Sequence, residues 1–169
     1  SCPQNNGFLE NEARILADIH NAANDDPRTI IAPFVPKALD HFLVPGDNGN
    51  MHRAFVIPYA PGYLSLTDIV KKFPAELDIR DAAWMMRRIV GHVIAARIAG
   101  VVHGSIVPDH VLVHPFSHDP LHIGWTHAKR DPHQTGERID IIIDRWEAWY
   151  PPEVARHELP DERTDIFMA

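Results

Sequence analysis

The chain has 169 residues, which is the length of one ordinary domain, and 45% of them are hydrophobic, enough to form a buried core. Its formal net charge of −7 argues against a protein that binds nucleic acid or an anionic membrane through a basic surface. No stretch approaches the ~20 apolar residues of a membrane-spanning helix, and the first residues do not have the pattern of a signal peptide. The single cysteine, Cys2, excludes an internal disulfide framework. We therefore expect a cytoplasmic protein that binds neither nucleic acid nor membrane.

The first part of the chain predicts one helix and one hairpin. From Phe8 to Ile19, apolar residues recur at helical spacing, which predicts an amphipathic helix. The segments Lys37–Val44 and Met51–Tyr59 have strand patterns, and the residues between them, 45–50, are rich in turn formers. An antiparallel hairpin is the simplest structure for this pair.

Two further helices are predicted next. Ser65-Leu66-Thr67-Asp68 matches a capping box, which begins a short helix that continues to about Phe73. The longest helical pattern runs from Asp78 to Ala99 and ends at Gly100. Its apolar face is predicted to contain Trp84, Met85, Ile89, Val93, Ala96 and Ile98, and its polar face Arg87, Arg88, His92 and Arg97.

The stretch from Val101 to Pro115 connects the long helix to a strand-like run at residues 111–113, and its polar residues have the character of a site loop. A second short strand is predicted at Leu121–Ile123. The apolar run Ile139–Ile143 is unusual for a mobile loop and is expected to pack or pair.

Residues 103–110 read His-Gly-Ser-Ile-Val-Pro-Asp-His and resemble the catalytic loop of protein kinases, His-Arg-Asp-x-x-x-x-Asn. His103 matches the histidine of that loop. Ser105 stands in the place of the catalytic Asp, and His110 in the place of the metal-binding Asn. Gly124-Trp125 resembles the beginning of the Asp-Phe-Gly motif, with Gly124 in place of the metal-binding Asp.

The resemblance continues on both sides of this loop. Glu12 matches the Glu of the αC helix, Pro151-Pro152-Glu153 resembles the Ala-Pro-Glu motif, and Asp165 matches the buried anchoring Asp of the αF helix. It implies an α+β, protein-kinase-like fold, with a partial small lobe in residues 1–60 and a partial, mostly helical large lobe in residues 61–169. The segment that would carry the glycine-rich loop and its Lys is missing, so we expect a fragment that runs from αC to the start of αF.

The resemblance also implies roles for single residues. Ile57, Tyr59 and Ala60 lie at the hinge and Leu112 at the floor of the adenine site, so these four would line a vestigial nucleotide cleft. Structural roles fall to Glu12, His103, Trp125, Glu153 and Asp165. Among these, His103 is expected to pack against Trp125, and Asp165 to anchor the backbone of the loop.

Kinase catalysis requires a carboxylate base and oxygen ligands for Mg²⁺. Ser105, His110 and Gly124 supply neither, so the sequence predicts a catalytically inactive pseudokinase that serves as a scaffold or regulatory module with a protein partner. We expect no cofactor, and ATP without Mg²⁺ is the less favoured case. The alternative is an atypical protein kinase or nucleotide-binding transferase with a non-standard active site. A third interpretation is an α+β domain unrelated to kinases.

Histidines are dense between residues 103 and 133, and several are four residues apart. On one helix such spacing would favour a metal site, but Pro108, Pro115 and Pro120 interrupt the run, so no metal site is expected. A nucleophile pair of His103 and Ser105 is not expected, because the sequence shows no third acidic residue and no nucleophile elbow.

Overall fold

The computed structural model describes residues 6–25, 31–46, 49–74, 77–161 and 163–169 and has a mixed α and β composition with small antiparallel sheets, which confirms the α+β class. The helices are α1 (Asn6–Asp25), η2 (Ala32–Phe34), α2 (Leu66–Lys72), α3 (Ile79–Ile98), η3 (Trp125–His127), α4 (Pro132–Thr135), η4 (Asp144–Trp149), α5 (Pro152–Ala155) and α6 (Thr164–Met168). The strands are β1 (Asp40–Pro45), β2 (Met51–Val56), β3 (Leu64–Ser65), β4 (Val101–Val102), β5 (Val111–Val113), β6 (Pro120–His122) and β7 (Lys129–Arg130).

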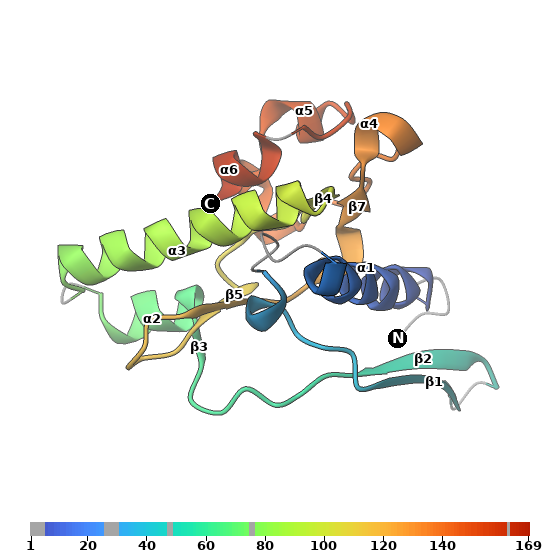
Figure 1. Ribbon diagram of the computed structural model, residues 1–169, viewed down its shortest axis with the longest axis horizontal. Helices are drawn as coiled ribbons and strands as arrows, with labels where there is room; N and C mark the ends of the chain where they lie inside the picture. The colour runs from blue at the N-terminus through green and yellow to red at the C-terminus, as the bar shows by residue number, and fades with distance from the viewer. Residues whose placement is uncertain (1–5, 26–30, 47–48, 75–76, 162) are drawn as a thin grey trace.

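The long helix α3 crosses the middle of the molecule (Figure 1). The hairpin β1–β2 lies on one side of it and the helices α4, α5 and α6 lie on the other. Helix α1 packs against η3 and β2. No helix in the described ranges is both long enough and apolar enough to cross a membrane.

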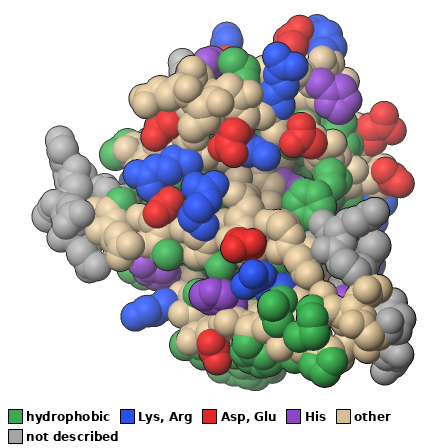
Figure 2. Space-filling model, turned by 90° about the vertical axis from the view of Figure 1, so that its right-hand side faces the viewer, with side chains coloured by type: hydrophobic (Ala, Val, Ile, Leu, Met, Phe, Trp, Pro, Cys, Tyr) green, Lys and Arg blue, Asp and Glu red, His purple; other side chains and the backbone are tan. Residues whose placement is uncertain are grey.

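The predicted hairpin is confirmed, although it is shorter than the sequence suggested. Strands β1 and β2 pair antiparallel, with Asp40 opposite Val56 and Pro45 opposite Met51. Most of β1 is exposed, including Phe42 and Leu43. Figure 2 shows hydrophobic side chains gathered at the lower edge of the molecule, the side on which Figure 1 places this hairpin.

The caps of α2 and α3 agree with the predicted helix starts. The Oγ of Ser65 accepts a hydrogen bond from the backbone N–H of Asp68 at 3.0 Å, and the carboxylate of Asp78 accepts one from the N–H of Arg80 at 2.8 Å. These contacts satisfy amide groups that a helix start leaves free. Gly100, with φ of +75°, follows the end of α3, a conformation that glycine adopts without steric cost.

The predicted faces of α3 are partly wrong. Met85, Ile89, Val93 and Ala96 are buried as expected, but His92, assigned to the polar face, is buried with them. Trp84 and Ile98, assigned to the core, are 47% and 59% exposed. The buried stripe follows the i, i+4 and i, i+7 positions from Met85, so side chains to either side of it remain at the surface.

Two small sheets hold the loop between α3 and η3. Strand β5 lies between β3 and β6, with Leu64 opposite Val113 and Val111 opposite His122. Strand β4 pairs with β7. The strand predicted at Leu121–Ile123 is therefore present, one residue earlier in the chain.

Two groups of buried side chains form the core. One joins α2, α3, the loop and the C-terminal segments and includes Met85, Val107 and Met168. The other joins α1, η2, the end of α3 and η3 around Trp125. Ile139 belongs to the first group at 1% exposure without forming a strand, so the apolar run at residues 139–143 packs and does not pair.

Candidate functional site

Strand β4 and the loop that follows it form the longest unbroken buried run among the described residues, because every residue from Val101 to Val107 is buried. His103 has its ring 1% exposed. Its Nδ1 lies 3.2 Å from the backbone N–H of Ser105, and its Nε2 lies 3.1 Å from the carbonyl oxygen of Ile123. Nδ1 therefore accepts and Nε2–H donates, which is the neutral imidazole. Burial, with smaller contributions from neighbouring histidines, holds the pKa of His103 well below its usual range.

Asp165 of α6 anchors this loop through the backbone. Its two carboxylate oxygens accept hydrogen bonds from the N–H groups of His103 at 2.6 Å and Gly104 at 2.8 Å. The carboxyl group is buried, and burial raises its pKa to about 6 even though both hydrogen bonds favour the charged form. One short helix near the end of the described chain thus fixes a loop about sixty residues earlier.

Ser105 and His110 lie in direct contact with each other and with Gly124. The Oγ of Ser105 donates a hydrogen bond to the carbonyl oxygen of Gly124 at 3.3 Å. The Nδ1 of His110 lies 3.0 Å from that Oγ and 2.9 Å from the carbonyl oxygen of Ser105. Since a carbonyl oxygen only accepts, Nδ1 carries the proton. This nitrogen cannot remove a proton from Ser105, and neither can His103, whose ring nitrogens are already engaged.

The ring of His110 occupies the space beside Gly124. A Cβ atom built on Gly124 would lie 2.7 Å from the imidazole, closer than real Cβ contacts allow. Gly124 also has φ of +77°, which disfavours other residues. A side chain at position 124 and the present position of His110 therefore exclude each other.

Trp125 connects the loop to α1. Its ring centroid lies 4.3 Å from that of His103, and its indole N–H donates to the carbonyl oxygen of His122 at 2.9 Å. Its backbone N–H donates to the Oε1 of Glu12 at 3.1 Å. Burial raises the pKa of Glu12, and the hydrogen bond from Trp125 partly opposes that rise. The structure thus brings four of the predicted structural residues together: Glu12, His103, Trp125 and Asp165.

Glu153, the fifth of these residues, lies apart from the loop in α5. Its Oε1 accepts a hydrogen bond from the Oγ1 of Thr164 at 2.9 Å, and Thr164 is fully buried beside Asp165. Glu153 therefore supports the beginning of α6, and with it the helix that anchors the loop.

The residues predicted for a nucleotide cleft lie on the connection after β2 and in β5. Tyr59 is 87% exposed and Ile57 is 38% exposed, while Ala60 is half-buried. Leu112 lies in the middle of β5, opposite Leu121 and Ser65. The two apolar clefts that flank α2 are lined by other residues.

Asp109 is a polar centre whose partners the sequence did not reveal. Its carboxylate accepts hydrogen bonds from Thr67 Oγ1 at 2.7 Å and Trp146 Nε1 at 2.9 Å, and it pairs with Arg145. Burial acts to raise the pKa of Asp109, but these donors together outweigh it and lower the pKa. The partners lie 36 to 42 residues away in the chain, so no local pattern marks them.

Within the described part of the chain, no group of three or more His, Cys, Asp or Glu side chains is placed to hold a metal ion. A scan against protein-family models matched none, and a search of curated proteins found no relative.

Proposed function

We propose that the chain has a protein-kinase-like fold that has lost phosphoryl transfer and acts as a scaffold or regulatory interaction module. The observation that carries this proposal is the contact among Ser105, His110 and Gly124, in which the imidazole takes the space that a side chain at position 124 would need.

Phosphoryl transfer depends on positioned charge: a carboxylate near the acceptor hydroxyl and oxygen ligands around Mg²⁺. The contact among these residues offers a buried hydroxyl and a protonated ring nitrogen, each already engaged in a hydrogen bond. Imidazole nitrogen is also a poor ligand for Mg²⁺, which prefers oxygen. The chemistry of the site therefore favours a structural role for the loop over catalysis.

The order of elements supports the kinase-like part of the proposal. A helix carrying Glu12 precedes a hairpin, and two helices then lead to a loop followed by a short antiparallel strand pair. Trp125 comes after that pair and contacts both Glu12 and His103. Asp165 holds the loop from a helix at the far end. These contacts support the proposal, because they join residues that the resemblance in sequence selects.

The test is a direct assay of nucleotide binding and transfer. We expect Mg²⁺-ATP at millimolar concentration to leave the melting temperature unchanged, and radiolabelled γ-phosphate not to appear on the protein or on a general protein substrate. The physical reason is that no carboxylate stands at positions 105, 110 and 124 to neutralise the metal and phosphate charges.

The matched variant is Ser105→Ala, which removes the only hydroxyl of this contact. Phosphate transfer by the unaltered protein that is lost in Ser105→Ala would sink the proposal and favour an atypical transferase. Transfer that is equal in both proteins would come from a contaminating enzyme, which a further purification step removes.

A further inference from the structure

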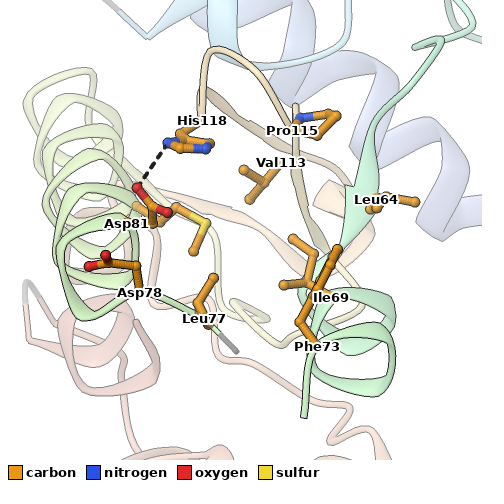
Figure 3. A pocket seen from close by; sticks show the side chains of 10 residues that line it. Leu64, Ile69, Phe73, Leu77, Asp78, Asp81, Val113, Pro115 and His118 are labelled. Atoms are coloured by element: carbon orange, nitrogen blue, oxygen red, sulfur yellow. Dashed lines mark ion pairs between the residues drawn. The ribbon is translucent and has the colours of Figure 1, made fainter. Parts of the chain in front are cut away.

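An apolar cleft of about 210 Å³ lies between α2, the start of α3 and the strand β5 (Figure 3). Its apolar lining includes Leu64, Ile69, Phe73, Leu77, Met85 and Val113. Figure 3 shows the aliphatic side chains pointing toward one another across the cleft, with the carboxylates of Asp78 and Asp81 at the α3 side and His118 next to Asp81. The cleft lies apart from the contact among Ser105, His110 and Gly124, so binding in the cleft is independent of any catalysis at that contact.

The polar groups of the cleft are arranged to receive a cation. Among the described residues, two carboxylates and one imidazole line it, and no Lys or Arg does. Asp78 is already committed, since it caps α3 and pairs with Arg80 at 2.7 Å. Asp81 has a weaker partner: its Oδ1 lies 3.8 Å from the Nδ1 of His118, which carries a full charge only when protonated. A guanidinium group could bind the Asp81 carboxylate through two hydrogen bonds and displace this long contact.

The size of the cleft favours side chains over a complete small-molecule ligand. Pockets for drug-sized ligands occupy roughly 300–1,000 Å³, and this cleft is smaller. Its rim adds exposed apolar surface, because Phe73 is 38% exposed, Leu77 is 43% exposed and Phe116, next to the lining residue Pro115, is 91% exposed. The net charge of −7 adds a general attraction for basic partners.

We propose that this cleft binds a segment of a partner protein that places an aliphatic side chain in the apolar floor and a neighbouring arginine on Asp81. The aliphatic side chain is buried among Ile69, Met85 and Val113, which supplies the affinity. The arginine supplies specificity, since its guanidinium group offers two N–H donors and a positive charge to the partly exposed carboxylate of Asp81.

The test is an NMR titration of the ¹⁵N-labelled protein with the blocked tripeptide acetyl-Leu-Arg-Leu-amide. We expect saturable shifts at the backbone amides of residues 77–85 and 113–118, with a dissociation constant in the millimolar range because the probe is small. The matched probe is the same peptide with citrulline in place of arginine, which keeps the shape and removes the charge. We expect it to bind about threefold to fivefold more weakly, the loss typical of an ion pair at a partly exposed carboxylate.

Two variants and one control complete the design. Asp81→Asn should abolish the difference between the two peptides. Leu77→Lys, at an exposed position, should weaken both by at least about tenfold, because it replaces an apolar side chain of the cleft lining with a charged one. Glu147→Gln removes the same charge from an exposed site outside the cleft and should bind as the unaltered protein does.

Three outcomes would overturn the proposal: no shifts in the cleft, equal affinity for the arginine and citrulline peptides, or unchanged binding in Leu77→Lys. Shifts of the same amides that depend on the protein's own concentration would also overturn it, because they would assign the cleft to a second copy of the chain. A free alkylamine that binds as tightly as the arginine peptide would assign it to a small molecule instead.

Discussion

At the residue scale, the least expected feature is a row of buried histidine rings. His92 stacks on Phe34 with centroids 3.9 Å apart and lies 5.3 Å from His122, which lies 6.4 Å from His103. Among the described residues, His92 Nδ1 and His122 Nε2 have no hydrogen-bond partner. Burial lowers the pKa of His92 to about 4, with Arg88 adding to the shift and Asp119 opposing it. Burial likewise lowers the pKa of His122 to about 3. The folded protein thus keeps these rings neutral.

These histidines predict a loss of stability in mild acid. Between pH 6.5 and about 4 the unfolded chain takes up protons on His92 and His122 that the folded chain does not, so the free energy of unfolding falls as pH falls. Each contributes a slope of up to about 1.4 kcal/mol per pH unit. Asp165, whose pKa is raised to about 6, acts in the opposite direction between about pH 4 and 6. The destabilising effect of the two histidines in acid is larger than the stabilising effect of this one carboxyl group. His103, whose pKa is also lowered, adds to the destabilisation.

Urea unfolding at pH 7, 6 and 5 measures this slope. In His92→Gln we expect the free energy of unfolding to change less steeply with pH. The difference corresponds to about one proton fewer taken up on unfolding, because the new side chain does not titrate. A free energy of unfolding that is constant over this range in the unaltered protein would contradict the neutral assignment of the buried rings.

At the scale of elements, the hairpin β1–β2 has little apolar burial, because most of β1 is exposed. Within the described residues it is a sheet of two strands, and such sheets are marginal by themselves. The side chain of Asn6 in α1 attaches the hairpin through two hydrogen bonds. Its Nδ2 donates to the carbonyl oxygen of Met51 at 2.9 Å, and its Oδ1 accepts from the N–H of Arg53 at 2.8 Å. Helix α3, in contrast, buries a continuous stripe in the core.

Amide hydrogen exchange should separate these two elements. We expect the amides of β1 and β2 to exchange at least tenfold faster than those of the buried face of α3, because local opening of the hairpin exposes little apolar surface. Asn6→Ala should raise exchange in β2 by about tenfold further, since two hydrogen bonds are lost. Asn11→Ala is the matched control: Asn11 bonds to the carbonyl oxygens of Thr126 and Ala128, so its loss should affect η3 and leave the hairpin unchanged. Equal protection in the hairpin and α3 would show that the hairpin does not open by itself.

At the scale of the whole molecule, long-range polar contacts join the two ends of the chain to the central loop. Glu12 reaches Trp125 across 113 residues, and Asp165 reaches His103 across 62. Trp149 adds a hydrogen bond from its indole N–H to the carbonyl oxygen of Met168 at 2.7 Å. The loop is therefore held from α1 on one side and from α6 on the other, and neither helix is a separate unit.

The prediction at this scale concerns Asp165→Asn. An amide has one acceptor oxygen and one NH₂ group, so it can satisfy only one of the two backbone N–H groups of His103 and Gly104 and directs a donor at the other. We expect the free energy of unfolding at pH 7 to fall by about 2 kcal/mol, the cost of one unsatisfied buried donor. Asp144→Asn, an exposed residue of η4, is the control and should change it by less than about 0.5 kcal/mol. A fall in Asp165→Asn no larger than that of the control would mean that the loop is fixed by packing alone.

The sequence by itself determined the elements that depend on local forces. The helix starts at Ser65 and Asp78, the stop at Gly100 and the hairpin turn before Met51 follow from capping, backbone freedom and alternation within a few residues. The sequence also singled out the loop at residues 103–110 and the residues Glu12, Trp125 and Asp165. It did so because their order along the chain resembles the order of motifs in protein kinases.

Only the tertiary structure decided how those residues meet. The burial of His92 in place of Trp84 depends on which side of α3 receives the neighbouring elements. The partners of Asp109 come from segments 36 to 42 residues away. The imidazole of His110 beside Gly124 depends on two backbone segments approaching until a single Cβ atom no longer fits. Local propensity acts over a few residues, whereas these contacts are set by close packing between distant segments, so they become visible only when the chain is folded.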